Sequence, residues 1–202
     1  MNNYYSIGGK NYSQVARANA PQEVEISTIV IRELKGVNEL PFELTLIKST
    51  ITKNGLLESA DLDGIKDIWL DYMPNSLAFP MFSERMREII DHNLTGNENI
   101  DWITAKINGN NEDRTYYILR FNKVLDVLNY DKTSFIEDTD YVIIPTFELA
   151  KIHNYSIFHI PSSDHLCSIT TQIYINETLK NQLQKGKLIG LNFEKVSAHR
   201  IT

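Results

Sequence analysis

The segment that decides the fold covers residues 117–135, YILRFNKVLDVLNYDKTSF, and its character changes along its length. It opens with apolar and aromatic residues in the pattern of a buried strand, and it closes on a cluster of Asp, Asn, Thr and Ser. Residues 102–107 repeat the strand pattern, and the polar residues 108–114 in between have the composition of an exposed hairpin loop. The middle of the chain is therefore predicted to be antiparallel β structure.

Other segments carry the same strand signal, and two carry the signal of a helix start. Strands are predicted at residues 24–31, 42–47, 141–144, 156–160 and 190–196. Ser83 can cap a helix with Met86 and Ile90 on its apolar face, and Asn176 can cap a short helix that ends at Gly186. Because strands outnumber helices, the predicted fold class is α+β: a mixed, mostly antiparallel sheet with a few short helices.

The domain organisation follows from length and composition. A chain of 202 residues with 42% hydrophobic residues can bury one substantial core. The polar residues 1–20 are predicted to form a loose N-terminal arm, and Pro21 marks the entry to the first firm strand. Residues 21–202 are predicted to form a single α+β domain, with two lobes joined near residues 95–100 as the alternative.

Composition and charge indicate where the protein works and what it binds. The opening MNNYYSIGGK lacks the regions of a secretory signal, no apolar run approaches membrane-spanning length, and the single Cys167 cannot form an intrachain disulfide. We therefore expect a cytoplasmic protein without a membrane partner. Twenty Lys and Arg against 26 Asp and Glu give a net charge of -6, which disfavours nucleic acid as a partner and favours a basic one.

The polar end of the opening segment could be a reaction centre or a turn. Its carboxylates, with those that follow, could hold a divalent cation or form an acid/base pair: Asp126, Asp131, Glu137, Asp138 and Asp140. The alternative is that Asn129, Asp131, Thr133 and Ser134 form a turn, and that residues 137–140 form a solvated loop. We favour the turn and expect no metal, because the segment lacks the Gly of an EF-hand loop and has no nearby His.

The remaining polar motifs predict no catalytic site. His153, His159 and His165 are evenly spaced, but residues 161–163 (PSS) interrupt the strand between them. The neighbours Ser163, Asp164 and His165 cannot converge as a triad, and Cys167 has the apolar setting of an inert core thiol. The sequence also lacks the glycine-rich phosphate loops and the GxSxG elbow. We expect neither enzyme activity nor a cofactor.

Several segments, taken in order, resemble a family of bacterial polymorphic-toxin immunity proteins that was earlier catalogued as a domain of unknown function. They are residues 67–80, the helix start at Phe82 and Ser83, residues 125–129 (LDVLN), Ile157 with Phe158, and residues 175–193 with Gly186 and Gly190. The likeness covers about residues 61–196. This sequence has Asn129 where the family often has a second Asp, Thr133 or Ser134 where it has Ser, His159 where it has Arg, and Ile189 where it has Thr.

The resemblance implies a non-catalytic, cytoplasmic antidote that binds and neutralises a cognate toxin. An acidic surface would steer such a protein toward a basic toxin, and aromatic anchors would hold the complex. The predicted contact residues are two acidic loops and three tyrosines: Glu112, Asp113, Glu137, Asp138, Asp140, Tyr116, Tyr117 and Tyr141. The alternatives are a metal-dependent hydrolase that uses Asp126 and Asp131, and a regulatory protein-binding domain.

Overall fold

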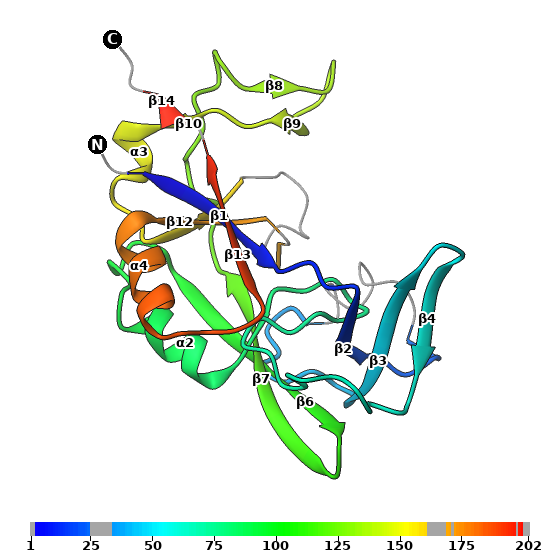
Figure 1. Cartoon of the computed structure of the whole chain (residues 1–202). Coiled ribbons are helices and arrows are strands. Elements are labelled where there is room, and N and C mark those ends of the chain that lie inside the picture. Colours follow the sequence, from blue (N-terminus) through cyan, green and yellow to red (C-terminus); the bar gives the residue numbers. More distant parts are fainter. Residues whose placement is uncertain (1–2, 25–33, 161–168, 171, 197, 200–202) are drawn as a thin grey trace.

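Two large β-sheets organise the chain, and two of the helices lie together beside the first of them (Figure 1). The structure is a computed structural model, and it describes residues 3–24, 34–160, 169–170, 172–196 and 198–199. Strands outnumber helices among these residues, and most strand pairs are antiparallel. The predicted α+β class, with a mixed, mostly antiparallel sheet and a few short helices, is confirmed. No helix among the described residues is long and apolar enough to cross a membrane.

The first sheet is entirely antiparallel and joins strands from both ends of the chain. In spatial order its strands are β11 (Ile157–His159), β12 (Ile173–Asn176), β1 (Tyr4–Gly9) and β13 (Leu191–Val196). A parallel pair, β10 (Phe147–Glu148) with β14 (Ala198–His199), lies beyond it in the same half of the molecule (Figure 1). A separate two-stranded ribbon consists of β8 (Ser134–Phe135) and β9 (Val142–Ile144).

The second sheet holds the central hairpin that the opening segment predicts. Its strands, in spatial order, are β2 (Gln14–Asn19), β3 (Leu44–Thr52), β6 (Ile100–Gly109), β7 (Glu112–Phe121) and β5 (Met81–Phe82), and β4 (Gly55–Ser59) pairs with β3. Only β3 and β6 run parallel. The β6–β7 turn is tighter than predicted, because Asn110 and Asn111 alone form it, with φ of 52° and 60°. Asn tolerates this left-handed region, which a two-residue hairpin turn requires.

The chain's opening is an integral part of the fold, so the prediction of a loose arm over residues 1–20 is wrong. Strand β1 lies between β12 and β13, where Tyr4 opposes both Asn176 and Val196. Tyr4 and Ile7 are buried, and β2 then enters the second sheet. The strand partners of β1 lie at residues 173–176 and 191–196, so a local pattern could not reveal them.

The helices begin where the sequence predicts. Helix α2 (Glu84–Asp91) is capped by Ser83, whose Oγ accepts from the Met86 amide, and helix α4 (Glu177–Lys185) is capped by Asn176 and ends at Gly186. A single turn, α3 (Leu149–Ile152), follows β10. The buried face of α4, with Leu179 and Leu183, packs on the first sheet, and α2 lies between α4 and β7.

Strand β7 joins the two hydrophobic clusters of the molecule. Because side chains alternate along a strand, Tyr116 and Ile118 enter one cluster while Leu119 and Phe121 enter the other. The two clusters therefore meet along β7, and no single point of the chain separates them. The predicted strand at 24–31 lies outside the described residues except for Val24, whereas the other predicted strands correspond to β3, β6, β7, β9, β11 and β13.

Candidate protein-binding surface

Two of the three predicted tyrosine anchors belong to the core. Tyr116 is 2% exposed, and its hydroxyl donates to the Leu70 carbonyl at 2.8 Å. Tyr117 is 9% exposed and packs under the guanidinium of Arg87, 4.1 Å from the ring centre. The prediction that they are contact residues is therefore wrong. Both faces of β7 are covered from Tyr116 to Phe121, so the rule that every second strand residue is exposed fails there.

The two acidic loops do not form one surface. Glu112 and Asp113 lie at the tip of the β6–β7 hairpin, whereas Glu137, Asp138 and Asp140 lie on the β8–β9 ribbon at the opposite end of the molecule (Figure 1). All five are exposed. Glu112 is engaged by Arg114 at 2.7 Å. A partner of ordinary size would contact one loop or the other.

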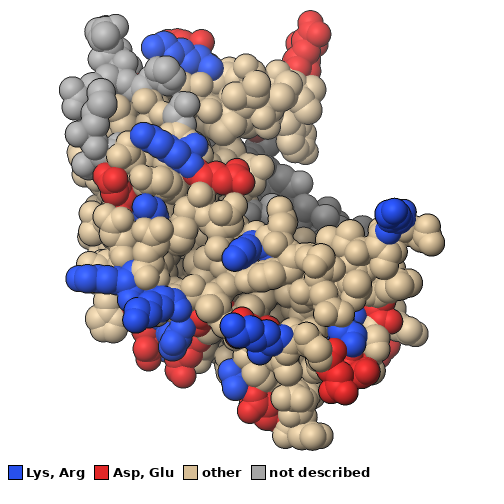
Figure 2. All heavy atoms as spheres, in the orientation of Figure 1, with Lys and Arg blue, Asp and Glu red and all other residues tan. Residues whose placement is uncertain are grey.

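The β8–β9 ribbon and its connections carry the largest group of exposed apolar side chains among the described residues. We define the apolar arm as residues 130–146, which comprise β8, β9 and their connections. Its exposed apolar residues, each between 51% and 62% exposed, are Tyr130, Ile136, Tyr141, Ile143 and Ile144. The arm stands clear of the body in Figure 1, and a protrusion with acidic atoms at its far end is seen at the upper right of Figure 2.

The two faces of the arm differ. Phe135 and Val142 are half-buried against the hydrophobic cluster that contains Leu119 and Phe121. The Ile136 amide donates to the Tyr141 carbonyl, so these residues oppose each other across the ribbon. The β8–β9 register shifts between Ser134 and Phe135, so side chains do not simply alternate there, and Ile143 and Ile144 are both exposed. The outward face is thus apolar without a covering element among the described residues. Buried apolar contacts on one side and exposed ones on the other are typical of a recognition surface.

The root of the arm is the polar cluster that closes the opening segment. Asn129 is buried and donates through Nδ2 to Oε2 of the buried Glu148 at 2.9 Å. Thr133 donates to the Asn129 carbonyl at 2.8 Å, and Thr146 donates to the Lys132 carbonyl at 2.9 Å. These bonds tie the two ends of the arm to each other and to β10. The cluster is a turn, as predicted.

The carboxylates of this polar cluster do not converge on one point. Asp126 forms an ion pair with Lys151 at 2.7 Å, and Asp131 is exposed in the turn. In the part of the chain that the structure describes, no group of three or more His, Cys, Asp or Glu side chains could hold a metal ion. Lys151 also lies 5.2 Å from the ring of Tyr130, which stacks on Phe135 at 6.0 Å. The same lysine thus steadies the base of the arm.

The tip of the arm is also fixed by hydrogen bonds. Thr139 donates to the Ile136 carbonyl through both its amide, at 3.1 Å, and its Oγ1, at 2.9 Å, and its Oγ1 accepts from the Tyr141 amide at 3.2 Å. Asp138 occupies the left-handed region with φ of 60°, a conformation that Asp adopts more readily than most residues. Glu137, Asp138 and Asp140 are therefore displayed from an ordered turn.

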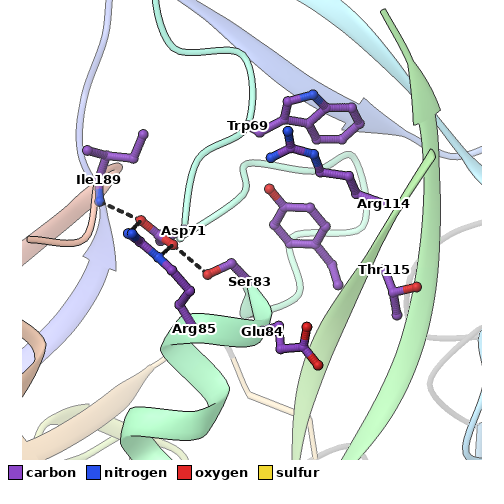
Figure 3. A pocket seen from close by; sticks show the side chains of 9 residues that line it. Trp69, Asp71, Ser83, Glu84, Arg85, Arg114, Thr115 and Ile189 are labelled. Atoms are coloured by element: carbon purple, nitrogen blue, oxygen red, sulfur yellow. Dashed lines mark hydrogen bonds and ion pairs between the residues drawn. The ribbon is translucent and has the colours of Figure 1, made fainter. Parts of the chain in front are cut away.

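A polar pocket of about 470 Å³ lies on the body, between Trp69, Asp71, helix α2 and β7 (Figure 3). Asp71 is 5% exposed and accepts from Ser83 Oγ at 2.5 Å, from Arg85 Nη2 at 2.9 Å and from the Ile189 amide at 2.8 Å. These contacts join three segments that are distant in the sequence. No local pattern singled out Asp71, because its partners come together only in the fold.

The other wall of this pocket is aromatic. The Arg114 guanidinium lies 4.7 Å from the Trp69 ring, and Trp69 stacks on Tyr116 at 6.3 Å (Figure 3). Burial raises the pKa of the Tyr116 hydroxyl, which keeps it protonated as the donor to Leu70. The charged side chains of the pocket, and the hydroxyls of Ser83 and Tyr116, bind one another or their neighbours. The pocket acts as a junction that holds the two halves of the fold.

The two candidate histidines that the structure describes lie in different elements and differ in burial. His159 is fully buried, its Nδ1 lies 2.8 Å from the Ile160 carbonyl, and its ring packs on Phe121 at 4.3 Å. Burial lowers its pKa. His153 is exposed on another element. Ser163, Asp164, His165 and Cys167 lie outside the described residues.

Comparison with known proteins leaves the family open. No protein-family model matches the chain, and no curated protein matches it. The likeness of residues 61–196 to the immunity proteins stays a prediction.

Proposed function

We propose that this chain is a non-catalytic immunity protein that acts in the cytoplasm and neutralises a cognate bacterial toxin by binding it. The observation that carries the proposal is the apolar arm. Exposed Ile and Tyr side chains are gathered on one ribbon, and hydrogen bonds fix both the root and the tip of that ribbon. Apolar and aromatic side chains on an ordered protrusion suit the centre of a protein interface.

Rigidity is the physical reason why such an arm favours binding. Each flexible side chain or loop that becomes ordered in a complex costs free energy, so a surface that is already ordered loses less on association. The net charge of -6 adds attraction toward a basic toxin and faster encounter with it. The resemblance to immunity proteins agrees with both features.

The direct test is co-expression with the product of the adjacent gene in a bacterial host. We expect that product to arrest growth alone, growth to recover when this chain is also made, and the two proteins to co-purify. An empty vector and an unrelated acidic protein of similar size serve as controls. The proposal fails if the adjacent product is harmless, or if it harms cells equally with and without this chain.

A further inference from the structure

We infer that the apolar arm docks on a basic polypeptide surface in which Lys or Arg side chains flank an apolar spot. The identification of that polypeptide as a toxin rests on the proposed function, but the chemistry of the contact does not. The inference draws on three features of the arm: its apolar face, its charge and its ordered ends.

The apolar face defines the centre of the contact. Ile136 and Tyr141 oppose each other across the ribbon, and both they and Ile143 are between 51% and 60% exposed. Tyrosine combines a large apolar ring with a hydroxyl that can remain hydrated or find a partner, which is why it is enriched in interfaces. This face requires an apolar counterpart on the partner.

The charge of the arm defines the rim of the contact. Within residues 130–146, Asp131, Glu137, Asp138 and Asp140 stand against the single cation Lys132, so four negative charges less one positive charge leave a balance of -3. At the far end of the protrusion in Figure 2, acidic atoms are seen without Lys or Arg beside them. No ion pair among the described residues involves the tip carboxylates. Cations on a partner would complement this rim.

The second exposed apolar hairpin lacks this combination. Ile51, Leu56 and Leu57 are exposed on β3 and β4, at 51% to 66%, but Lys53 occupies their turn. The nearest carboxylate along β4, that of Glu58, is paired with Arg17 at 3.4 Å. The β3–β4 hairpin therefore offers an apolar surface of similar exposure without an excess of negative charge. It supplies matched control positions.

A displayed library of random peptides, selected on the intact protein, tests the inference without knowledge of the natural partner. We expect the enriched peptides to combine Lys or Arg with apolar residues. Two arm variants should weaken their binding about tenfold or more: Tyr141→Ser with Ile143→Ser, and Glu137→Gln with Asp138→Asn and Asp140→Asn. All five side chains are exposed, so the fold should be retained, which circular dichroism and thermal melting verify.

Matched variants on the two other hairpins separate the arm from surface chemistry in general. Leu56→Ser with Leu57→Ser, and Glu112→Gln with Asp113→Asn, should change peptide affinity by less than about twofold. Raising NaCl from about 50 to about 500 mM should weaken binding to the natural protein, and it should weaken binding to the carboxamide arm variant less.

Three outcomes would overturn the inference. They are the absence of enriched peptides, enrichment of peptides that lack basic residues, and binding that the arm variants leave unchanged. A dimer in sedimentation experiments that dissociates when Tyr141→Ser and Ile143→Ser are introduced would also overturn it, because the arm would then bind a second copy of the chain.

The inference and the proposed function can fail separately. Growth rescue by the co-expressed chain, together with peptide binding that does not depend on the arm, would reject this inference alone. Arm-dependent binding of basic peptides without growth rescue would reject the proposed function alone.

Discussion

At the scale of single residues, buried polar side chains determine how distant segments meet. Arg120 is 7% exposed, and it binds Asp101 with Nε and Nη2 at 2.7 Å while Nη1 donates to the carbonyls of Leu34 and Val37. Asp101 is partly buried, which raises its pKa, but the hydrogen bonds and charge of Arg120 outweigh this effect and leave the pKa lowered. Such groups stabilise the fold only when all their bonds are made.

Asp71 should be the most sensitive of these positions outside the apolar core. We expect Asp71→Ala to reduce the free energy of unfolding by about 3 kcal/mol, because it leaves the partly buried Ile189 amide and Ser83 hydroxyl without their acceptor. Urea denaturation measures the change. The exposed neighbour Asp67 is the control, and Asp67→Ala should cost less than about 0.5 kcal/mol. Equal losses for the two variants would mean that Asp71 does not hold the segments together.

His159 should make stability depend on pH. Burial holds its pKa in the folded protein below the ordinary value of 6.5, so the unfolded chain binds a proton more readily than the folded one. Its contribution is therefore fully present above about pH 6.5 and is lost as the pH falls toward the lowered pKa. His159→Phe should remove this component of the slope of unfolding free energy between about pH 5 and 7, whereas the exposed His153→Gln should retain it. Identical slopes for His159→Phe and the natural protein would contradict the assignment.

At the scale of elements, two segments differ in burial from what their sequences predict. Strand β1 is hidden in the middle of a sheet although its sequence is polar and rich in Gly. The apolar arm is exposed although its sequence contains the run Val142-Ile143-Ile144, which predicts a strand with a buried face. Only Val142 of that run packs against the core cluster.

The position of β1 predicts a strong effect of changes at the start of the chain. Removal of residues 1–10 should prevent cooperative unfolding, because β12 and β13 then lose the strand that joins them. Ile7→Ala should cost about 2–4 kcal/mol, and the half-buried Ser6→Ala in the same strand should cost less than about 0.5 kcal/mol. Thermal melting and circular dichroism report both effects. A truncated protein that melts like the full chain would restore the loose-arm interpretation.

At the scale of the whole molecule, the chain crosses between the two sheets, so neither sheet is a separate unit. Strand β1 belongs to the first sheet and β2 to the second, and the Asp71 junction ties both to helix α2. Gly190 allows the chain to pass close to this junction. Its φ is +86°, and an added Cβ would lie 2.9 Å from the Tyr72 carbonyl oxygen. The body is thereby held firm, and the apolar arm projects from it at one end (Figure 1).

Local patterns in the sequence determined the class of the fold, most of the strands, and both long helices with their caps. They did so because hydrophobic periodicity and capping are properties of a few neighbouring residues, as Ser83 and Asn176 show. The turn at residues 129–133 was also predictable, since Asn, Asp and Thr bond their own backbone.

The tertiary structure alone decided the place of β1, the burial of Tyr116 and Tyr117, the Asp71 junction and the separation of the two acidic loops. Each depends on partners that lie far away along the chain, and sequence periodicity cannot show whether the second face of a strand is covered. The same limit applied to the candidate surface. Its carboxylates and Tyr141 were predicted as contact residues, but the exposure of Ile136, Ile143 and Ile144 beside them follows only from the way in which the arm leaves the core.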